Sequence, residues 1–185
     1  MDKRVVITGM GIWSCLGHTL EEVRQSLYSG KSGIVFSQER KDAGFRSCLC
    51  AHIDKPDLKP FIPRNQRQFM AEETQYAYMA TRTALEHANI DMDYLEKNEV
   101  GIIYGNDSAV ESTMIALDKF RQMKDTAAAG SGAVFQSMNS TVSMNLACLF
   151  KLKGINMTAS AACASSSQAI GLAALLIKNG LQECV

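Results

Sequence analysis

Residues 154–170 constrain the fold of this chain more than any other stretch. They begin with a short apolar run of strand type, residues 155–158, which leads into a turn of small residues that carries Cys163. Beyond the cysteine, apolar side chains recur at helical spacing up to Gly180, at Ile170, Ala173, Ala174 and Ile177. The sequence therefore predicts a strand, a tight turn and a helix, with Cys163 at or near the N-terminus of that helix.

This position gives Cys163 two possible roles. A helix N-terminus offers free backbone N–H groups and the positive end of the helix dipole, which favour a thiolate and an oxyanion. Ser160, Ala161 and Ala162 add little bulk, so a thioester or ketone has room to reach the sulfur. The pattern thus fits an activated nucleophile. On spacing alone it fits equally well a buried cysteine that acts as a small apolar side chain.

Strands and helices alternate along the rest of the chain. Thr19 and Glu22 predict a capping box for a helix that ends at Gly30, and Ser108 with Glu111 predicts a second one. We expect buried strands at 5–7 and 100–104, a half-buried strand at 48–52, helices at 65–88 and 138–150, and a flexible connection at 127–132. This order predicts an α/β fold, a mixed sheet covered by helices, in a single domain over residues 1–185.

Composition excludes several classes of partner. The 19 basic and 19 acidic residues balance, so no net field attracts nucleic acid or an anionic membrane. The longest apolar runs fall far short of the ~20 residues that a membrane span needs, and no signal peptide is expected at the N-terminus. The six cysteines are scattered and do not form a disulfide framework, which fits a cytoplasmic protein.

Two short patterns suggest a cofactor or a metal, and neither holds up. Gly9 and Gly11 resemble the start of a dinucleotide-binding fingerprint, but Ser14 stands where its third glycine belongs, so a glycine turn is the better interpretation. Cys48, Cys50 and His52 alternate along one expected strand, yet a structural zinc site usually needs a fourth ligand. We therefore predict no cofactor and no metal.

Several motifs give the chain a family resemblance. They are Gly154 followed by Ala162-Cys163-Ala164-Ser165-Ser166 and Ile170, the opening residues 4–12 with Leu16-Gly17, residues 31–34, and Phe69-Met70. Together they resemble the β-ketoacyl synthases, the condensing enzymes of fatty acid and polyketide synthesis, and especially the bacterial acyl carrier protein-dependent synthase I/II type. The matches occur in family order and span essentially the whole chain.

The resemblance implies a fold and a reaction. The fold would be the N-terminal half of a thiolase-like fold, with the second α/β half missing from this chain. Cys163 would accept an acyl group from a carrier thioester, and an enolate made by decarboxylation of a malonyl thioester would then attack it. No cofactor enters this reaction, and the protein would act in the cytoplasm.

The same resemblance implies that part of the machinery is absent. In the family a pair of histidines, or a histidine and an asparagine, stabilises the enolate with a lysine nearby, all in the missing half. His18, His52 and His87 do not replace them. We therefore expect the isolated chain to be inactive in condensation, and a separate C-terminal half is a candidate partner.

Further expectations concern surfaces. Arg64, Arg67, Arg121 and Lys124 would meet an acidic acyl carrier protein, although a basic pair on a helix is often only a solvated face and Gln68 departs from the family's arginine. Met138 and Ala162 would line the acyl pocket, whose shape is left open because residues 105–109 depart from the family's run of glycine and serine. Residues 155–158 would pair with their two-fold mate in a homodimer.

Two other functions remain as alternatives. One is a non-catalytic subunit, like the chain-length factors of some polyketide systems, and the other is a fragment without activity of its own. Cys163 argues against the first, because such subunits typically lack the nucleophile. Acyl chain length, and the choice between fatty acid, polyketide and aryl-polyene pathways, stay open.

Overall fold

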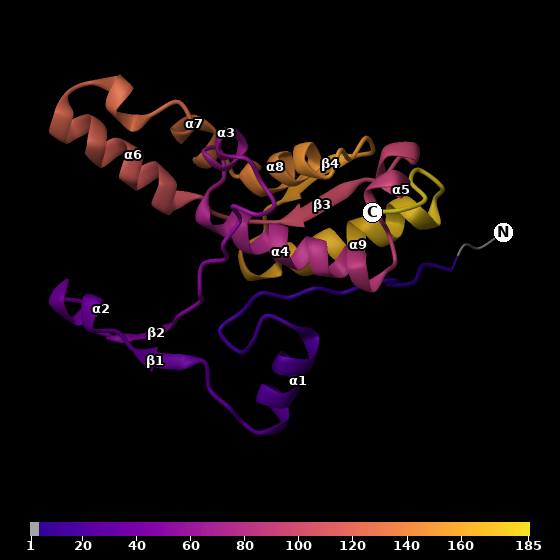
Figure 1. Cartoon of the computed structure of the whole chain (residues 1–185), viewed down its shortest axis with the longest axis horizontal. Helices are drawn as coiled ribbons and strands as arrows, with labels where there is room; N and C mark the ends of the chain where they lie inside the picture. The colour runs from indigo at the N-terminus through magenta and orange to yellow at the C-terminus, as the bar shows by residue number, and fades with distance from the viewer. Residues whose placement is uncertain (1–3) are drawn as a thin grey trace. The chain divides into compact units, whose positions relative to one another are not determined.

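The computed structural model describes residues 4–185 (Figure 1). Its elements, in chain order, are α1 (Leu20–Tyr28), β1 (Ile34–Phe36), α2 (Gln38–Asp42), β2 (Leu49–Ala51), α3 (Arg64–Arg67), α4 (Glu72–His87), α5 (Met92–Lys97), β3 (Ile102–Gly105), α6 (Val110–Met123), the 3₁₀ turn η1 (Thr126–Ala129), α7 (Ala133–Gln136), α8 (Thr141–Leu149), β4 (Asn156–Ala159), the 3₁₀ turn η2 (Ala162–Ala164) and α9 (Ser165–Lys178). They fall into two compact units. The first contains Asp57–Gln75, Ile90–Val185 and the described residues up to Ile7; the second contains Thr8–Pro56 and Tyr76–Asn89.

The first unit is built on the parallel pair β3 and β4, with Tyr104 opposite Thr158 and Gly105 opposite Ala159. Because side chains alternate along a strand, these two neighbouring positions face opposite sides of the pair. Thr158 faces α8, where its Oγ1 lies 2.9 Å from Ser143 Oγ. Gly105 faces the start of α9. Helices α8 and α9 therefore cover the two faces, as Figure 1 shows.

The two edges of this strand pair differ. On the β3 side, Val100 forms a parallel bridge with Cys184, and Gly101 N–H donates to the Cys184 carbonyl at 3.0 Å. Within residues 4–185, β4 is hydrogen-bonded to a strand on one side only. Its second edge is thus open to another strand.

The expected helix over residues 65–88 is wrong in one respect, because it breaks between α3 and α4. The carbonyls of Gln68 and Phe69 leave the helical ladder and accept hydrogen bonds from Gln136 Nε2 at 2.9 Å and Asn145 Nδ2 at 3.2 Å. Met70 is buried in the break. Long-range amide contacts therefore override the helical spacing of the sequence.

Two expected features at element ends are also wrong. Residues 5–7 are extended but form no strand, because no strand of the described chain pairs with them, and Ile7 is 76% exposed. The second capping box does not form: α6 begins at Val110, and Ser108 Oγ accepts from the Val110 N–H at 3.2 Å, two residues on. A serine turn of this kind competes with the helix cap.

The connection before α8 is more structured than expected. Residues 127–132, expected to be flexible, contain most of η1, and the expected helix over residues 138–150 starts only at Thr141, after the separate α7. Strand β3, by contrast, overlaps the expected strand over residues 102–104 and extends one residue beyond it, to Gly105.

The second unit confirms two expectations, the first capping box and the half-buried strand, whereas Gly9 and Gly11 pack against a helix instead of forming the expected turn. Thr19 and Glu22 form the reciprocal capping box of α1. Gly9 and Gly11 lie directly against the backbone of α4, where a Cβ would collide with carbonyl oxygens of Ala84 and Ala80, so these glycines serve close packing. Strand β2 pairs antiparallel with β1, with Cys50 half-buried between exposed neighbours.

Membrane-spanning helices and metal-binding clusters are both absent from the described residues. None of the helices between residues 4 and 185 has the length and apolar character needed to cross a membrane. The same residues contain no cluster of three or more His, Cys, Asp or Glu side chains arranged to hold a metal ion.

Candidate functional site

The candidate site lies where β3 and β4 end. The carboxyl ends of parallel strands meet at the same edge of a sheet, and loops that leave this edge commonly carry functional groups. Two such loops leave here: residues 106–109 follow β3, and residues 160–164 follow β4 and carry Cys163. Asn106 N–H donates to the Ala159 carbonyl at 3.0 Å and holds the two loops together at their origin.

Cys163 occupies the middle of η2, directly before α9, and it is exposed. The interpretation of this residue as a buried apolar side chain is therefore wrong. The N-cap of α9, Ala164, has no side chain that caps the helix. The backbone N–H of Ser165, the first residue of α9, donates to the Ala162 carbonyl. The N–H groups that follow it in the first turn have no carbonyl of α9 to donate to and can donate to an oxyanion. An accessible thiol next to these N–H groups can accept an acyl group.

The turn before Cys163 has a strained backbone. Ala162 has a φ of 48°, in the left-handed region that non-glycine residues seldom adopt. Ser165 supports this conformation from the first position of α9: its Oγ accepts from the Ala161 N–H at 2.8 Å and donates to the Ala162 carbonyl at 2.7 Å. The buried Ser165 side chain thus fixes the turn to the helix.

Asp107 supports the same turn from the β3 side. Its carboxylate accepts a hydrogen bond from the Ser160 hydroxyl. The bond from Ser160 first, and the nearby Ala162 backbone second, lower the pKa of Asp107 below its ordinary value. Sequence reasoning missed this residue. The available signal was its place two residues beyond a strand that runs parallel to the strand before Cys163.

A third loop joins through a pair of asparagines. Asn106 Nδ2 donates to the Asn139 carbonyl at 2.9 Å, and Asn139 Nδ2 donates to the Asn106 carbonyl at 3.0 Å. This exchange places Met138, the residue before Asn139, on a loop attached to the site, with its side chain 39% exposed. The structure thus ties the loops of Met138, Ala162 and Cys163 to one segment, residues 106–107.

The four basic residues do not form one cluster. Arg64 and Arg67 lie on α3, and Arg67 Nε donates to the Ile62 carbonyl at 3.0 Å, which commits part of its guanidinium to the fold. Arg121 lies near the end of α6, where its Nη1 is 3.6 Å from Asp118 Oδ1. Lys124 is the C-cap of that helix and has a left-handed backbone conformation. In Figure 1 this end of α6 projects away from α3.

The three histidines all belong to the second unit and all have partners there. His18 stacks on Trp13 with ring centroids 3.8 Å apart, and His87 Nδ1 accepts from the Met10 N–H at 3.1 Å. His52 Nε2 lies 3.4 Å from Asp54 Oδ1. Each histidine thus has a local structural contact.

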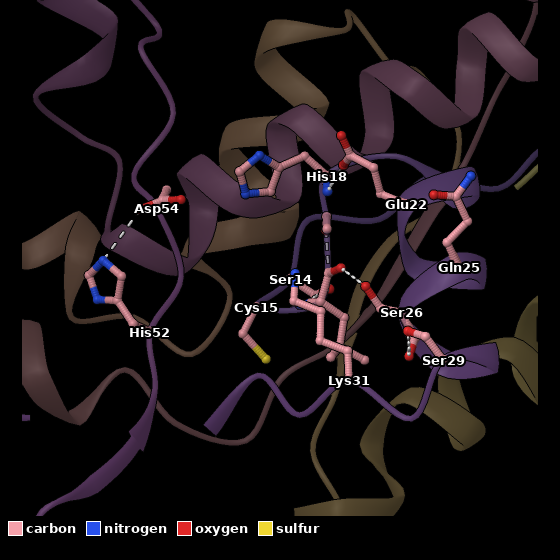
Figure 2. Close-up of a pocket in the computed structure, with 12 residues that line it drawn as sticks. Ser14, Cys15, His18, Glu22, Gln25, Ser26, Ser29, Lys31, His52 and Asp54 are labelled. Atoms are coloured by element: carbon pink, nitrogen blue, oxygen red, sulfur yellow. Dashed lines mark hydrogen bonds and ion pairs between the residues drawn. The ribbon is translucent and has the colours of Figure 1, made fainter. Parts of the chain in front are cut away.

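The second unit also contains an open cavity of about 610 Å³ (Figure 2). Several of its polar groups serve the local fold. Glu22 Oε2 accepts from the His18 and Thr19 N–H groups at 2.7 and 3.1 Å, and Ser26 Oγ donates to the Leu16 carbonyl at 2.7 Å. Cys15 is the cysteine of this lining, and Cys163 takes no part in it.

Comparison with known proteins establishes the family. The profile described as "Beta-ketoacyl synthase, N-terminal domain" matches residues 2–185. The chain belongs to the β-ketoacyl synthase family. The resemblance noted from its motifs is thereby confirmed.

Individual relatives agree with this assignment. The 3-oxoacyl-[acyl-carrier-protein] synthase 1 of Buchnera aphidicola subsp. Schizaphis graminum is 38% identical over 186 residues, which are 99% of this chain and 46% of the relative. A β-ketoacyl synthase crystal structure from Burkholderia phymatum STM815 is 29% identical with a TM-score of 0.82, over 97% of this chain and 45% of that one. A type II PKS ketosynthase in complex with its acyl-carrier protein has a TM-score of 0.78 at 22% identity, over 97% of this chain and 48% of that one, and shows the fold alone.

These matches identify the fold and show how much of each relative the chain covers. The predicted α/β fold is confirmed as the N-terminal half of a thiolase-like fold, because the solved relatives are ketosynthases. The chain spans about half the length of the relatives it matches.

Proposed function

We propose that this chain is the nucleophile-bearing part of a β-ketoacyl-acyl carrier protein synthase. The synthase would join an acyl thioester to malonyl-acyl carrier protein by a decarboxylating Claisen condensation. The observation that carries the proposal is the exposed Cys163, which stands before the uncapped N-terminus of α9 in a chain of this family.

The chemistry would proceed through an acyl-cysteine. The Cys163 thiolate attacks the carbonyl carbon of the acyl thioester, and the resulting oxyanion accepts hydrogen bonds from N–H groups at the start of α9. Collapse breaks the carbon–sulfur bond to the carrier, whose thiolate leaves and takes up a proton. Loss of carbon dioxide from the malonyl thioester then gives an enolate that attacks the acyl-cysteine and releases Cys163. The groups that stabilise this enolate are proposed, by resemblance, to lie outside these 185 residues.

An acyl carrier protein is the proposed partner. The related synthases are named for this carrier. The exposed Arg64 on α3 and the C-terminal end of α6, with Arg121 and Lys124, offer positive charge for an acidic carrier. A cytoplasmic location belongs to the same proposal, because scattered thiols suit a reducing compartment.

Product analysis tests the proposed reaction. The full-length protein that carries this chain is mixed with an acyl thioester and malonyl-acyl carrier protein, and the carrier is analysed by mass spectrometry. The proposal expects β-ketoacyl-acyl carrier protein together with released carbon dioxide. Failure to form either product with any of a series of short-, medium- and long-chain acyl thioesters would reject it.

We also propose a homodimer that is formed through β4. Its second edge is open within the described residues, Met157 is 46% exposed, and open apolar edges favour pairing with another strand. Met157→Lys should therefore shift the sedimentation of the protein from dimer toward monomer. Met92→Lys, at a 40% exposed methionine on α5, serves as the matched control and should leave the dimer intact. A monomeric wild type, or a dimer that Met157→Lys does not weaken, would contradict this interface.

A further inference from the structure

We infer that Asp107 is a positioning residue for the nucleophile, because it holds the turn that precedes Cys163 from the neighbouring strand. The inference rests on the proposed role of Cys163. It concerns a segment, residues 105–109, in which this chain departs from the pattern of its family.

The geometry begins with the end of the strand pair. The β3–β4 ladder reaches Gly105 and Ala159, and the bond from Asn106 N–H to the Ala159 carbonyl extends it by one step. Beyond that bond the two loops are joined by Asp107, which accepts a hydrogen bond from the Ser160 hydroxyl. Ser160 lies three residues before Cys163.

The need for such support comes from Ala162. Its left-handed φ of 48° costs free energy that the surroundings must offset. Ser165 anchors this turn on the α9 side, through Ala161 N–H and the Ala162 carbonyl. Asp107 holds it on the other side, through the Ser160 hydroxyl, and the Ala162 backbone lies close enough to lower the pKa of the Asp107 carboxyl group as well. The segment before Cys163 is thus held from two directions.

The charge of Asp107 makes this bond strong. The pKa of its carboxyl group is held below the ordinary value by the bond from Ser160 and then by the nearby Ala162 backbone, so the group is ionised at neutral pH. Hydrogen bonds to an ionised acceptor are stronger than neutral ones. Asp107 itself is exposed, so its removal leaves no cavity in the core.

A set of variants of the full-length protein separates positioning from folding. For each, the rate of acyl transfer to Cys163 is measured over a range of acyl thioester concentrations, with the unfolding midpoint alongside. Asp107→Ala should lower the maximal acylation rate by about 10- to 100-fold, because small displacements of a reacting group cost rates of that order. KM should change by less than about threefold, since uniform binding is untouched.

Two further variants and a control sharpen the test. Asp107→Asn keeps one acceptor oxygen but loses the charge, so it should recover part of the lost rate, and Ser160→Ala should lie between wild type and Asp107→Ala. Asp125→Ala is the matched control: Asp125 accepts from the Ala127 N–H at 2.9 Å at the start of η1, away from this turn. It should leave acylation unchanged.

The outcomes separate this inference from the proposed function. Wild-type acylation in Asp107→Ala, or a loss that Asp107→Asn shares in full, would overturn the positioning role. So would a loss that follows the fraction of unfolded protein in each variant. An acyl adduct that persists in Cys163→Ala would instead reject the nucleophile itself, whatever the behaviour of Asp107.

Discussion

Replacing Cys163 by alanine should abolish condensation by the full-length protein, with a loss on the order of 10³-fold or more. The thiol is the atom that would bond to the acyl group, and alanine removes it while keeping the small volume that the turn requires. Because Cys163 is exposed, its replacement opens no core cavity, and the unfolding midpoint should stay near that of the wild type. The measurement is the rate of β-ketoacyl product formation.

Cys148→Ala provides the matched control. Cys148 is likewise exposed, but it lies on α8 and lines a small apolar pocket together with Phe69 and Phe135. Its replacement should leave condensation essentially unchanged. If the two variants lose activity equally, or if Cys163→Ala keeps activity near that of the wild type, the assignment of the nucleophile is wrong.

Gly105→Ala should both destabilise the protein and slow acyl transfer. A Cβ at this position would lie 2.5 Å from the backbone carbonyl carbon of Ser165 and 2.5 Å from Ser166 Cα, and neither is the flexible end of a side chain. The start of α9 would have to move, which costs about 1–3 kcal/mol of unfolding free energy. Since Ser165 anchors the turn before Cys163, the same movement would displace the thiol.

Gly171→Ala isolates the effect of that collision. Gly171 lies within α9, and a Cβ there would meet no atom within 4 Å. Alanine favours the helix by up to about 1 kcal/mol relative to glycine, so this variant should be slightly stabilised. Chemical denaturation of the two variants gives the comparison. A Gly105→Ala protein as stable as Gly171→Ala would show that α9 does not press on β3 as described.

The sequence predicted the parts of this site that depend on local pattern. The strand, turn and helix around Cys163 follow from apolar spacing over residues 154–170, and the capping box of α1 follows from Thr19 and Glu22. Both features depend on residues that are close together in the sequence. The family followed from motifs of the same kind.

Two features that the sequence did not predict depend on contacts between residues far apart in the chain. The break between α3 and α4 is set by Gln136 and Asn145, more than sixty residues later, as the separations of 68 and 76 residues show. The support from Asp107 reaches Ser160 across 53 residues. Local spacing cannot identify the residues that make these long-range contacts. In the case of Asp107, the strand register that brings the two loops together has no sequence signature of its own.

The mechanism depends above all on which atom carries the acyl group. The full-length protein is incubated with an acyl-carrier thioester without malonyl substrate, then digested and mapped by mass spectrometry. The acyl mass should appear on the peptide that contains Cys163 and on no peptide with another cysteine. An acyl group found on Cys15 or Cys148 instead, or condensation without any acylated peptide, would contradict an acyl-cysteine intermediate at Cys163.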